Sequence, residues 1–249
     1  MHLEILACQH VGKRLMQQQD ALAIGNTTWQ RTRGHHHWHD RDDPPLLASV
    51  ADGVSASTNP ALASRSLLET LHGLPREILG DEAGPEHLKA AVLHALREWN
   101  HHFLDEATDG ASTTLATVLI GNASVAWINS GDSRIYHVQQ KDATTQWQQL
   151  SHDHTIWNAL LAEGVVTPEQ AQEAPAMWTH GLMHCLTLGD DLAEPEWGCG
   201  RCVVEPGDCL VLCTDGIHST LTSEQMQATF DPTESLDCNA KRWWETTLA

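Results

Sequence analysis

The stretch LATVLIGNASVAWINSGDSRIY, residues 115–136, decides the fold class. Its two apolar runs, residues 115–120 and 123–128, flank the turn pair Gly121-Asn122, and this spacing is typical of a β-hairpin. Residues 134–138 predict the next strand. We therefore expect an antiparallel meander, because strands joined by so few residues cannot run parallel.

Segments on either side of this meander predict helices. Residues 59–73 begin with Asn-Pro and end with Gly, which are typical helix boundaries. Residues 85–103 carry apolar side chains at the spacing of an amphipathic helix. Shorter helices are expected over residues 155–163 and from Thr167-Pro168 onward.

A second hairpin is predicted further along the chain. Residues 201–205 and 209–213 are joined by a turn in which Pro206 and Gly207 stand as a type II turn requires. The order of elements is then strands, two helices, a meander, a helical excursion, a hairpin and a final helix. This order predicts an α+β fold with antiparallel sheets and helices packed outside, and it disfavours a repeating βαβ sheet.

The chain of 249 residues is strongly acidic, with 33 Asp and Glu against 14 Lys and Arg and a formal charge of −19. Such a surface repels polyphosphate and anionic lipid, so we expect no nucleic-acid or membrane partner, whereas divalent cations are attracted. No linker divides the chain, which predicts a single domain over residues 1–249. The start lacks the pattern of a signal peptide, and the 7 cysteines are unevenly spread, so we expect a cytoplasmic protein with reduced thiols.

Acidic residues stand just beyond three apolar runs. Asp52 follows residues 46–51, Asp132 follows residues 125–130, and Asp215 follows residues 209–213. Because strand ends of one sheet meet at one edge, these carboxylates can converge on a hard cation that takes oxygen ligands. Asp109-Gly110 follows a polar stretch instead and predicts only a turn.

Two other groups of residues, one rich in histidine and one of cysteines, are weaker candidates for a functional metal site. Residues 31–45 include His35-His36-His37-Trp38-His39 and predict a solvated hairpin loop that binds transition metals adventitiously, with no catalytic role. Cys199, Cys202, Cys209 and Cys213 offer a zinc site as an alternative. However, the last two would lie about 13 Å apart in one strand, too far to share a tetrahedral ion.

Seven short motifs follow one another over nearly the whole chain: GKRLMQQQD (12–20), ADGV (51–54), GASTT (110–114), GDSRIY (131–136), LSHDHT (150–155), LTLG (186–189) and CTDGI (213–217). Together they resemble the metal-dependent PPM, or type 2C, protein serine/threonine phosphatases, and most closely the compact bacterial members. The resemblance implies a central sandwich of two antiparallel β-sheets flanked by helices, with a centre of two Mn²⁺ or Mg²⁺ ions at one end.

The resemblance also implies roles for single residues. Asp52 would bridge the two ions, the Gly53 carbonyl would bind one of them, and Asp215 would bind the other. Asp20 would lie beside the centre, and Asp132 would hold a third, weaker ion. A hydroxide bridging the ions would attack phosphorus directly. The segment over residues 153–175 corresponds to a variable flap that affects substrate choice.

The chain departs from the family pattern at several positions. Arg14, the candidate for clamping the phosphate oxygens, lies one residue away from the place of the family arginine. Gln19 stands where Glu is common. Val54 replaces the histidine that eukaryotic relatives offer as general acid, which leaves water, His152 or His154 for that role.

The C-terminal part departs most. Asp237-Cys238-Asn239 leads into a segment typical of a helix, where the family has an acidic ligand followed by a last apolar strand. We therefore expect the last strand to be missing and Asp237 not to be a metal ligand.

The resemblance implies a phosphoric monoester hydrolase that removes phosphate from phosphoserine and phosphothreonine in proteins. The expected partner is a phosphorylated protein, either a bacterial Ser/Thr kinase or its target, with regulation of type VI secretion as the more specific hypothesis and a monomer as the expected state. The alternative is a catalytically weak pseudophosphatase that binds a phosphoprotein or a kinase. The acidic residues favour the enzyme, and the shortened end with the displaced Arg14 favours the alternative.

Overall fold

The largest layer of the fold is an antiparallel six-stranded sheet with the strand order β12-β8-β7-β5-β2-β3. The computed structural model describes residues 3–13, 16–39, 45–80, 84–122, 124–141, 144–172, 174–189 and 195–248. The strands of this sheet are β2 (Asp20–Ile24), β3 (Thr27–Trp29), β5 (Leu46–Asp52), β7 (Leu115–Ile120), β8 (Ser124–Ser130) and β12 (Gly198–Val203). The hairpin predicted at Gly121-Asn122 is confirmed, because β7 pairs with β8.

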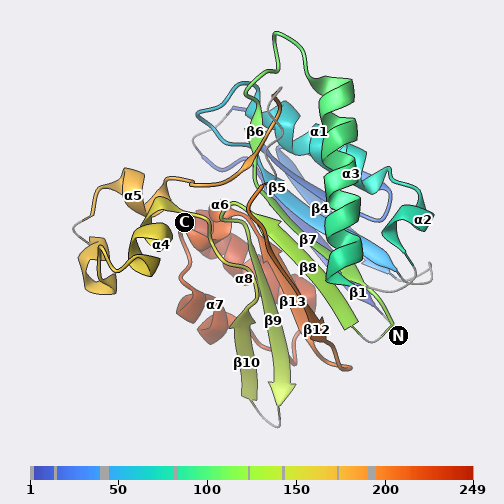
Figure 1. Ribbon diagram of the computed structural model, residues 1–249. Coiled ribbons are helices and arrows are strands. Elements are labelled where there is room, and N and C mark those ends of the chain that lie inside the picture. The colour runs from blue at the N-terminus through green and yellow to red at the C-terminus, as the bar shows by residue number, and fades with distance from the viewer. Residues whose placement is uncertain are drawn as a thin grey trace.

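The second layer consists of two smaller antiparallel sheets. β9 (Arg134–Lys141) lies between β10 (Thr144–Gln149) and β13 (Cys209–Cys213), and β1 (Glu4–His10) pairs with β4 (Arg33–His39). Apolar side chains of both layers form the core between them, among them Val118, Ile120 and Ile135. The predicted sandwich is thus confirmed (Figure 1). β9 crosses to this layer, so the meander does not continue within one sheet.

A cavity of about 770 Å³ separates the two parts of the second layer. Consecutive residues of β1 and of β13 line it, so the edges of these strands border the cavity. Helix α8 (Leu236–Leu248) forms another wall with Trp243 and Trp244. Among the residues that the structure describes, no strand follows α8 and none pairs with the edges of β1 and β13 that border the cavity.

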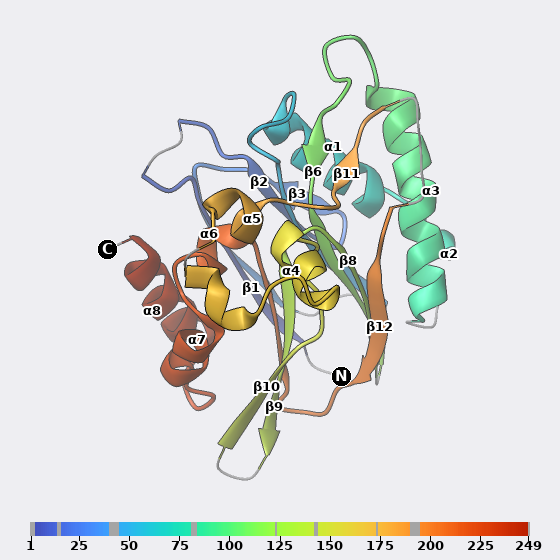
Figure 2. The same ribbon diagram turned by 60° about the vertical axis from the view of Figure 1, so that its left-hand side comes forward.

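Helices cover the outer faces of both layers (Figure 2). α1 (Pro60–His72), the short α2 (Arg76–Leu79) and α3 (Pro85–Phe103) cover the six-stranded sheet, with Leu67 and Leu88 in the core below them. α6 (Asp215–His218), α7 (Ser223–Thr229) and α8 lie against the second layer, with Met226 and Trp243 packed there. Within the described ranges, no helix is long and apolar enough to cross a membrane.

A helical excursion follows β10 and contains α4 (Ile156–Ala162), the 3₁₀ helix η1 (Pro168–Gln172) and α5 (Ala176–His180). β6 (Ser112–Thr113) and β11 (Leu186–Thr187) form a further small sheet. The helices predicted over residues 59–73, 85–103 and 155–163 are present near their expected bounds, the one from Thr167-Pro168 onward is the 3₁₀ helix η1, and the final helix is α8. Asn59 differs in detail: it has φ 45°, and its side chain donates to the Ala107 carbonyl (2.8 Å) instead of capping α1.

The structure corrects the predicted second hairpin. β12 pairs with β8 in the six-stranded sheet, whereas β13 pairs with β9 in the other layer. The turn is present, since the Asp208 amide donates to the Glu205 carbonyl (3.0 Å). The Asp208 carboxylate lies 2.8 Å from Nε2 of His137 on β9, and this buried pair holds the start of β13 against β9.

The predicted His-rich loop is also corrected. Residues 33–39 form strand β4, and residues 40–44 lie outside the described part of the chain. Strand alternation explains the difference, because His36 stacks on Trp29 (ring centroids 4.6 Å apart) and Trp38 packs on the core between the layers. His35 and His37 point to the other face of β4.

Candidate metal centre

Two aspartates lie directly opposite each other at the edge of the six-stranded sheet. Asp20 is the first residue of β2 and Asp52 is the last residue of β5, and the antiparallel register pairs them. Each of these two carboxyl groups acts on the pKa of the other. The position of Asp52 after an apolar run predicted its place at the strand ends, whereas the place of Asp20 was implied only by the family resemblance.

Asp215 and Asp132 join this pair from the other layer. Asp215 begins α6 directly after β13, and Asp132 stands in the turn between β8 and β9. Thr214, next to Asp215, donates from Oγ1 to Asp20 Oδ2 (3.4 Å), and Asp20, Asp52 and Asp215 line the same cavity. The charge of Asp215 acts on Asp132 as well, and we refer to these four residues as the acidic cluster. Asp215 is exposed, and the other three are half-buried, so the cluster opens to solvent on the Asp215 side.

Burial and like charge raise the pKa values in this cluster. Burial, with a contribution from Asp215, raises the pKa of Asp20 to about 6. The same two causes, with Asp153 as a further negative charge, raise the pKa of Asp132 to about 7. Burial and the charges of Asp20 and Asp215 raise the pKa of Asp52 well above its usual value. Such a cluster is costly unless protons or cations neutralise it.

Hydroxyl groups from the GASTT motif fix the backbone of Asp52. The Asp52 amide donates to Thr114 Oγ1 (3.0 Å), and the Asp52 carbonyl accepts from Thr113 Oγ1 (2.9 Å) and from the Thr114 amide (2.8 Å). Thr114 Oγ1 also lies 2.7 Å from Ser133 Oγ, next to Asp132. The sequence predicted no role for these residues, although the GASTT motif pointed to this segment.

Gly53 is buried where no side chain fits. A Cβ on Gly53 would lie 2.1 Å from the carbonyl oxygen of Pro60. The Gly53 amide donates a hydrogen bond to the Gln19 carbonyl (3.1 Å). The Gln19 side chain accepts from Ser55 Oγ (2.6 Å), so it ties the start of β2 to the loop after β5. Gln19 therefore holds the loop that carries Gly53 through two hydrogen bonds, one to its carbonyl and one to its side chain.

We expect Gly53→Ala to destabilise the metal-free protein by about 2 kcal/mol or more, because the added methyl group displaces the backbone at Pro60, the first residue of α1. Urea unfolding measures the effect. Gly189→Ala is the matched control, since its Cβ would meet Asp109 Oδ1 at an ordinary 3.6 Å. Equal stability losses in the two variants would contradict the prediction.

Asp153, the first residue of the segment expected to form the flap, belongs to a half-buried ion pair. Its carboxylate accepts hydrogen bonds from Arg134 Nε (2.9 Å), from Arg134 Nη2 (2.6 Å) and from Gln149 Nε2 (3.0 Å). Arg134 starts β9 and is paired with Cys213, which ends β13. Asp132 and Asp215 therefore lie next to paired strand ends, and the ion pair fixes the first residue of β9 to the segment after β10. The sequence offered only the GDSRIY and LSHDHT motifs as a signal.

Four further residues were considered from the sequence, and each has a separate outcome. His154 is buried and accepts at Nδ1 from the Gly131 amide (3.2 Å), and burial lowers its pKa, so it stabilises the turn before Asp132. His152 is exposed. Asp237 lies with His35 and His37, and it does not figure among the charges acting on the acidic cluster. Arg14 lies outside the described residues.

The comparisons with known proteins agree with this architecture. The family model described as Protein phosphatase 2C matches residues 19–248. The chain belongs to the protein phosphatase 2C family. Protein phosphatase PhpP of Streptococcus pneumoniae is 28% identical to this 2C chain over 148 residues, which is 55% of this chain and 56% of PhpP. The chain thus spans little more than half the length of that relative.

Solved structures show the same 2C fold. The Mycobacterium tuberculosis serine/threonine phosphatase PstP/Ppp superposes with a TM-score of 0.75 at 21% identity, over 99% of this chain and 92% of that one. The PstP catalytic domain in complex with 2 manganese ions gives 0.70 at 21% identity, over 99% and 91%. PppA, described as a key regulatory component of T6SS in Pseudomonas aeruginosa, gives 0.69 at 17% identity, over 99% and 91%.

The acidic cluster fits divalent cations. Its donors are carboxylate oxygens, the ligands that Mg²⁺ and Mn²⁺ prefer. Burial and like-charge repulsion raise the pKa values of Asp20, Asp52 and Asp132, and bound cations would offset both costs.

We expect the affinity of this cluster for Mn²⁺ to fall with pH below 7, because Asp132 (pKa about 7) and Asp20 (about 6) take up protons there and a bound cation requires the carboxylates. The apparent dissociation constant should rise on the order of tenfold per pH unit. Titration calorimetry at pH 8, 7 and 6 tests this. An affinity that is constant over these pH values would contradict it.

Proposed function

We propose that this chain is a metal-dependent protein phosphatase that hydrolyses phosphoserine and phosphothreonine. The observation that carries the proposal is the acidic cluster of Asp20, Asp52, Asp132 and Asp215, which four separate strand ends bring together within the fold of the 2C family. The proposal extends to this chain what the names of PhpP and PstP say of those proteins.

Each residue of the acidic cluster would have its own role as a metal ligand. Asp52 and Asp215, with Asp20 beside them and the Gly53 carbonyl next to Asp52, would hold two divalent cations, and Asp132 a third and weaker one. When bound, these cations supply positive charge for the phosphoryl oxygens and lower the pKa of a water molecule. The chain itself fixes the ligand geometry through Thr113 and Thr114 and keeps the cluster open to solvent at Asp215.

The helical excursion is the proposed contact for the phosphoprotein. Figure 1 shows α4, η1 and α5 standing out from the sandwich. Large apolar side chains are exposed on this segment and just after it: Val165 (63%), Met177 (70%), Trp178 (39%) and Met183 (50%). Exposed apolar side chains of this kind are common in protein-binding surfaces. A kinase or its target as the substrate, and regulation of secretion as for PppA, are the more specific parts of the proposal.

Hydrolysis of p-nitrophenyl phosphate and of a phosphothreonine peptide over a Mn²⁺ titration tests the proposal. We expect turnover that requires Mn²⁺ and is lost in Asp215→Asn. The control is Asp109→Asn, which changes an acidic residue in a turn outside the cluster and should keep the activity. No turnover by folded protein at millimolar Mn²⁺ would exclude the enzyme.

That negative outcome would favour the alternative, a pseudophosphatase. The observation behind it is the cavity between β1 and β13, where no described strand brings a further acidic ligand to the cluster. A binding protein of this kind should retain a phosphothreonine peptide with the phosphate intact, which phosphate release and mass spectrometry together distinguish from slow turnover.

A further inference from the structure

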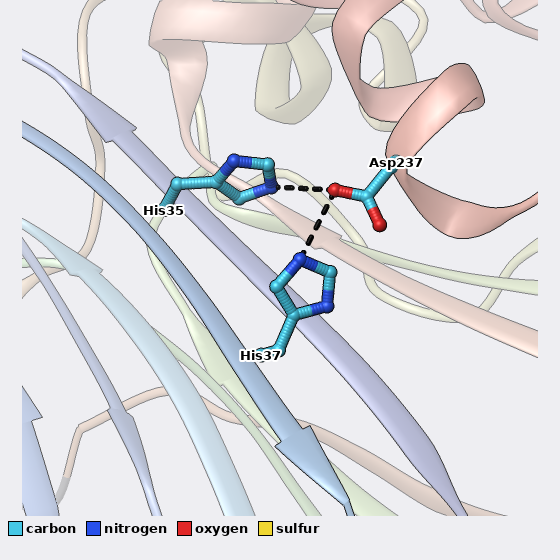
Figure 3. A group of neighbouring side chains, drawn as sticks. All are labelled: His35, His37 and Asp237. Atoms are coloured by element: carbon cyan, nitrogen blue, oxygen red, sulfur yellow. Dashed lines mark ion pairs between the residues drawn. The ribbon is translucent and has the colours of Figure 1, made fainter.

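A second group of metal-binding side chains lies outside the acidic cluster. His35 and His37 extend from the same face of β4, and Asp237 lies in the first turn of α8 (Figure 3). One carboxylate oxygen of Asp237 is 3.0 Å from Nε2 of His35 and 3.1 Å from Nε2 of His37. The three ligand atoms all lie within 4.8 Å of one another, and the group shares no residue with the acidic cluster.

The local structure explains why these three residues meet. Successive side chains of a strand alternate between its faces, so residues two apart in β4 project together. Their face is opposite to that of His36 and Trp38, which pack toward the core between the layers. α8 packs along β1, the partner strand of β4, and brings its N-terminal turn over this face.

The chemistry of the group favours zinc over the ions proposed for the acidic cluster. Two imidazole nitrogens and one carboxylate oxygen are a ligand set that zinc binds with its fourth position open, whereas Mg²⁺ and Mn²⁺ prefer oxygen ligands. Bonds of about 2.0–2.1 Å place tetrahedral ligand atoms about 3.3 Å apart. The measured 3.0 and 3.1 Å separations are close to that spacing. Water can occupy the fourth position, because the side chains are 53%, 41% and 41% exposed.

We propose that His35, His37 and Asp237 bind a zinc ion that fixes the start of α8 to β4. Among the ligands, only Asp237 comes from α8, so the ion joins the last helix to the N-terminal strands. α8 also forms a wall of the cavity that extends to Asp20 and Asp52. Zinc at this position would therefore hold that wall in place without entering the acidic cluster.

Equilibrium dialysis of the full chain tests the site. The protein is dialysed against micromolar Zn²⁺ in the presence of millimolar Mn²⁺, which occupies the acidic cluster, and the retained zinc is counted by metal analysis. We expect one zinc per chain, and at least tenfold weaker retention in both His35→Gln and Asp237→Asn. His102→Gln is the matched control, because it removes an exposed histidine (59%) that pairs with a carboxylate, Glu98, on α3. This variant should keep the zinc.

Hydrogen exchange measures the second part of the proposal. Zinc should slow amide exchange in the first turns of α8 in the wild type and not in His35→Gln, and circular dichroism establishes that each variant is folded. Zinc that is retained equally by His35→Gln and Asp237→Asn is adventitious and overturns the site. Zinc that depends on these residues but leaves exchange in α8 unchanged overturns the tether. Neither measurement depends on phosphatase activity, so the proposal stands or fails separately from the proposed function.

Discussion

Replacing Asp52 with asparagine is expected to lower Mn²⁺-dependent turnover by roughly 10³-fold, since several kcal/mol of transition-state stabilisation depend on correctly held cations. Asp52 is central to the acidic cluster, because the charges of both Asp20 and Asp215 act on it. An asparagine of the same shape removes the charge that neighbouring cations would share. The measurement is the rate of p-nitrophenyl phosphate hydrolysis at saturating Mn²⁺.

The same substitution is expected to stabilise the protein when no metal is present. The folded-state pKa of Asp52 is raised, so at pH 7 its ionisation costs folding free energy, and this cost disappears below the unfolded-state pKa. Asp52→Asn should therefore raise the metal-free unfolding free energy at pH 7 by about 1–2 kcal/mol, or Tm by about 2–8 °C, with little difference at pH 3.5. Mn²⁺ should reverse the order of stability by binding the wild type more tightly.

Asp105→Asn provides the comparison, because Asp105 is an exposed residue whose pKa is lowered by hydrogen bonds to Thr108, so that removing its charge should not stabilise the protein. A metal-free Asp52→Asn protein that is less stable than the wild type at pH 7 would show that the carboxylate is not under repulsion. Full activity in Asp52→Asn would remove this residue from the catalytic centre.

Local patterns predicted most of the secondary structure, but they did not predict which sheet each strand joins. The β7–β8 hairpin and helices α1 and α3 agree with their sequence signals, since turn residues and apolar spacing act over a few positions. β12 and β13 follow each other with a good turn between them and still pair with different sheets. That choice depends on distant partners, such as His137 for Asp208, which no short-range pattern contains.

The acidic cluster was predictable for a related reason. Asp52, Asp132 and Asp215 each follow an apolar strand, and strand ends of a sandwich meet, so these three come together in the structure. Asp20, which begins β2, was expected there only from the family resemblance. Their catalytic roles stay predictions. The supporting contacts were not predictable, because Thr114 and Asp153 act through hydrogen bonds to residues far away in the sequence. The His-rich segment was misread because composition outweighed strand alternation there.

The ion pair of Arg134 with Asp153 leads to the second large effect. Asp153→Ala leaves a half-buried guanidinium without its carboxylate, and removing one partner of such a pair is expected to cost about 2–4 kcal/mol and to lower Tm by about 5–15 °C. The exposed fractions of 21% for Arg134 and 10% for Asp153 keep this estimate below that of a fully buried pair. Mn²⁺ affinity should fall as well, because Arg134 lies two residues after Asp132 and the ion pair holds this start of β9 in place.

A double-mutant cycle separates the pair from other effects of the substitution. Arg134→Met, Asp153→Ala and the double variant should give a coupling free energy above about 1 kcal/mol, since the double variant no longer contains an unpaired charge. Glu245→Ala is the surface control: its pair with Lys241 is 3.7 Å long and 65–73% exposed, so Tm should hardly change. Additive losses in the cycle would mean that Arg134 and Asp153 stabilise the fold independently. The start of β9, next to Asp132, would then depend on its pairing with β13 and on the contact of Ser133 with Thr114, and not on this ion pair.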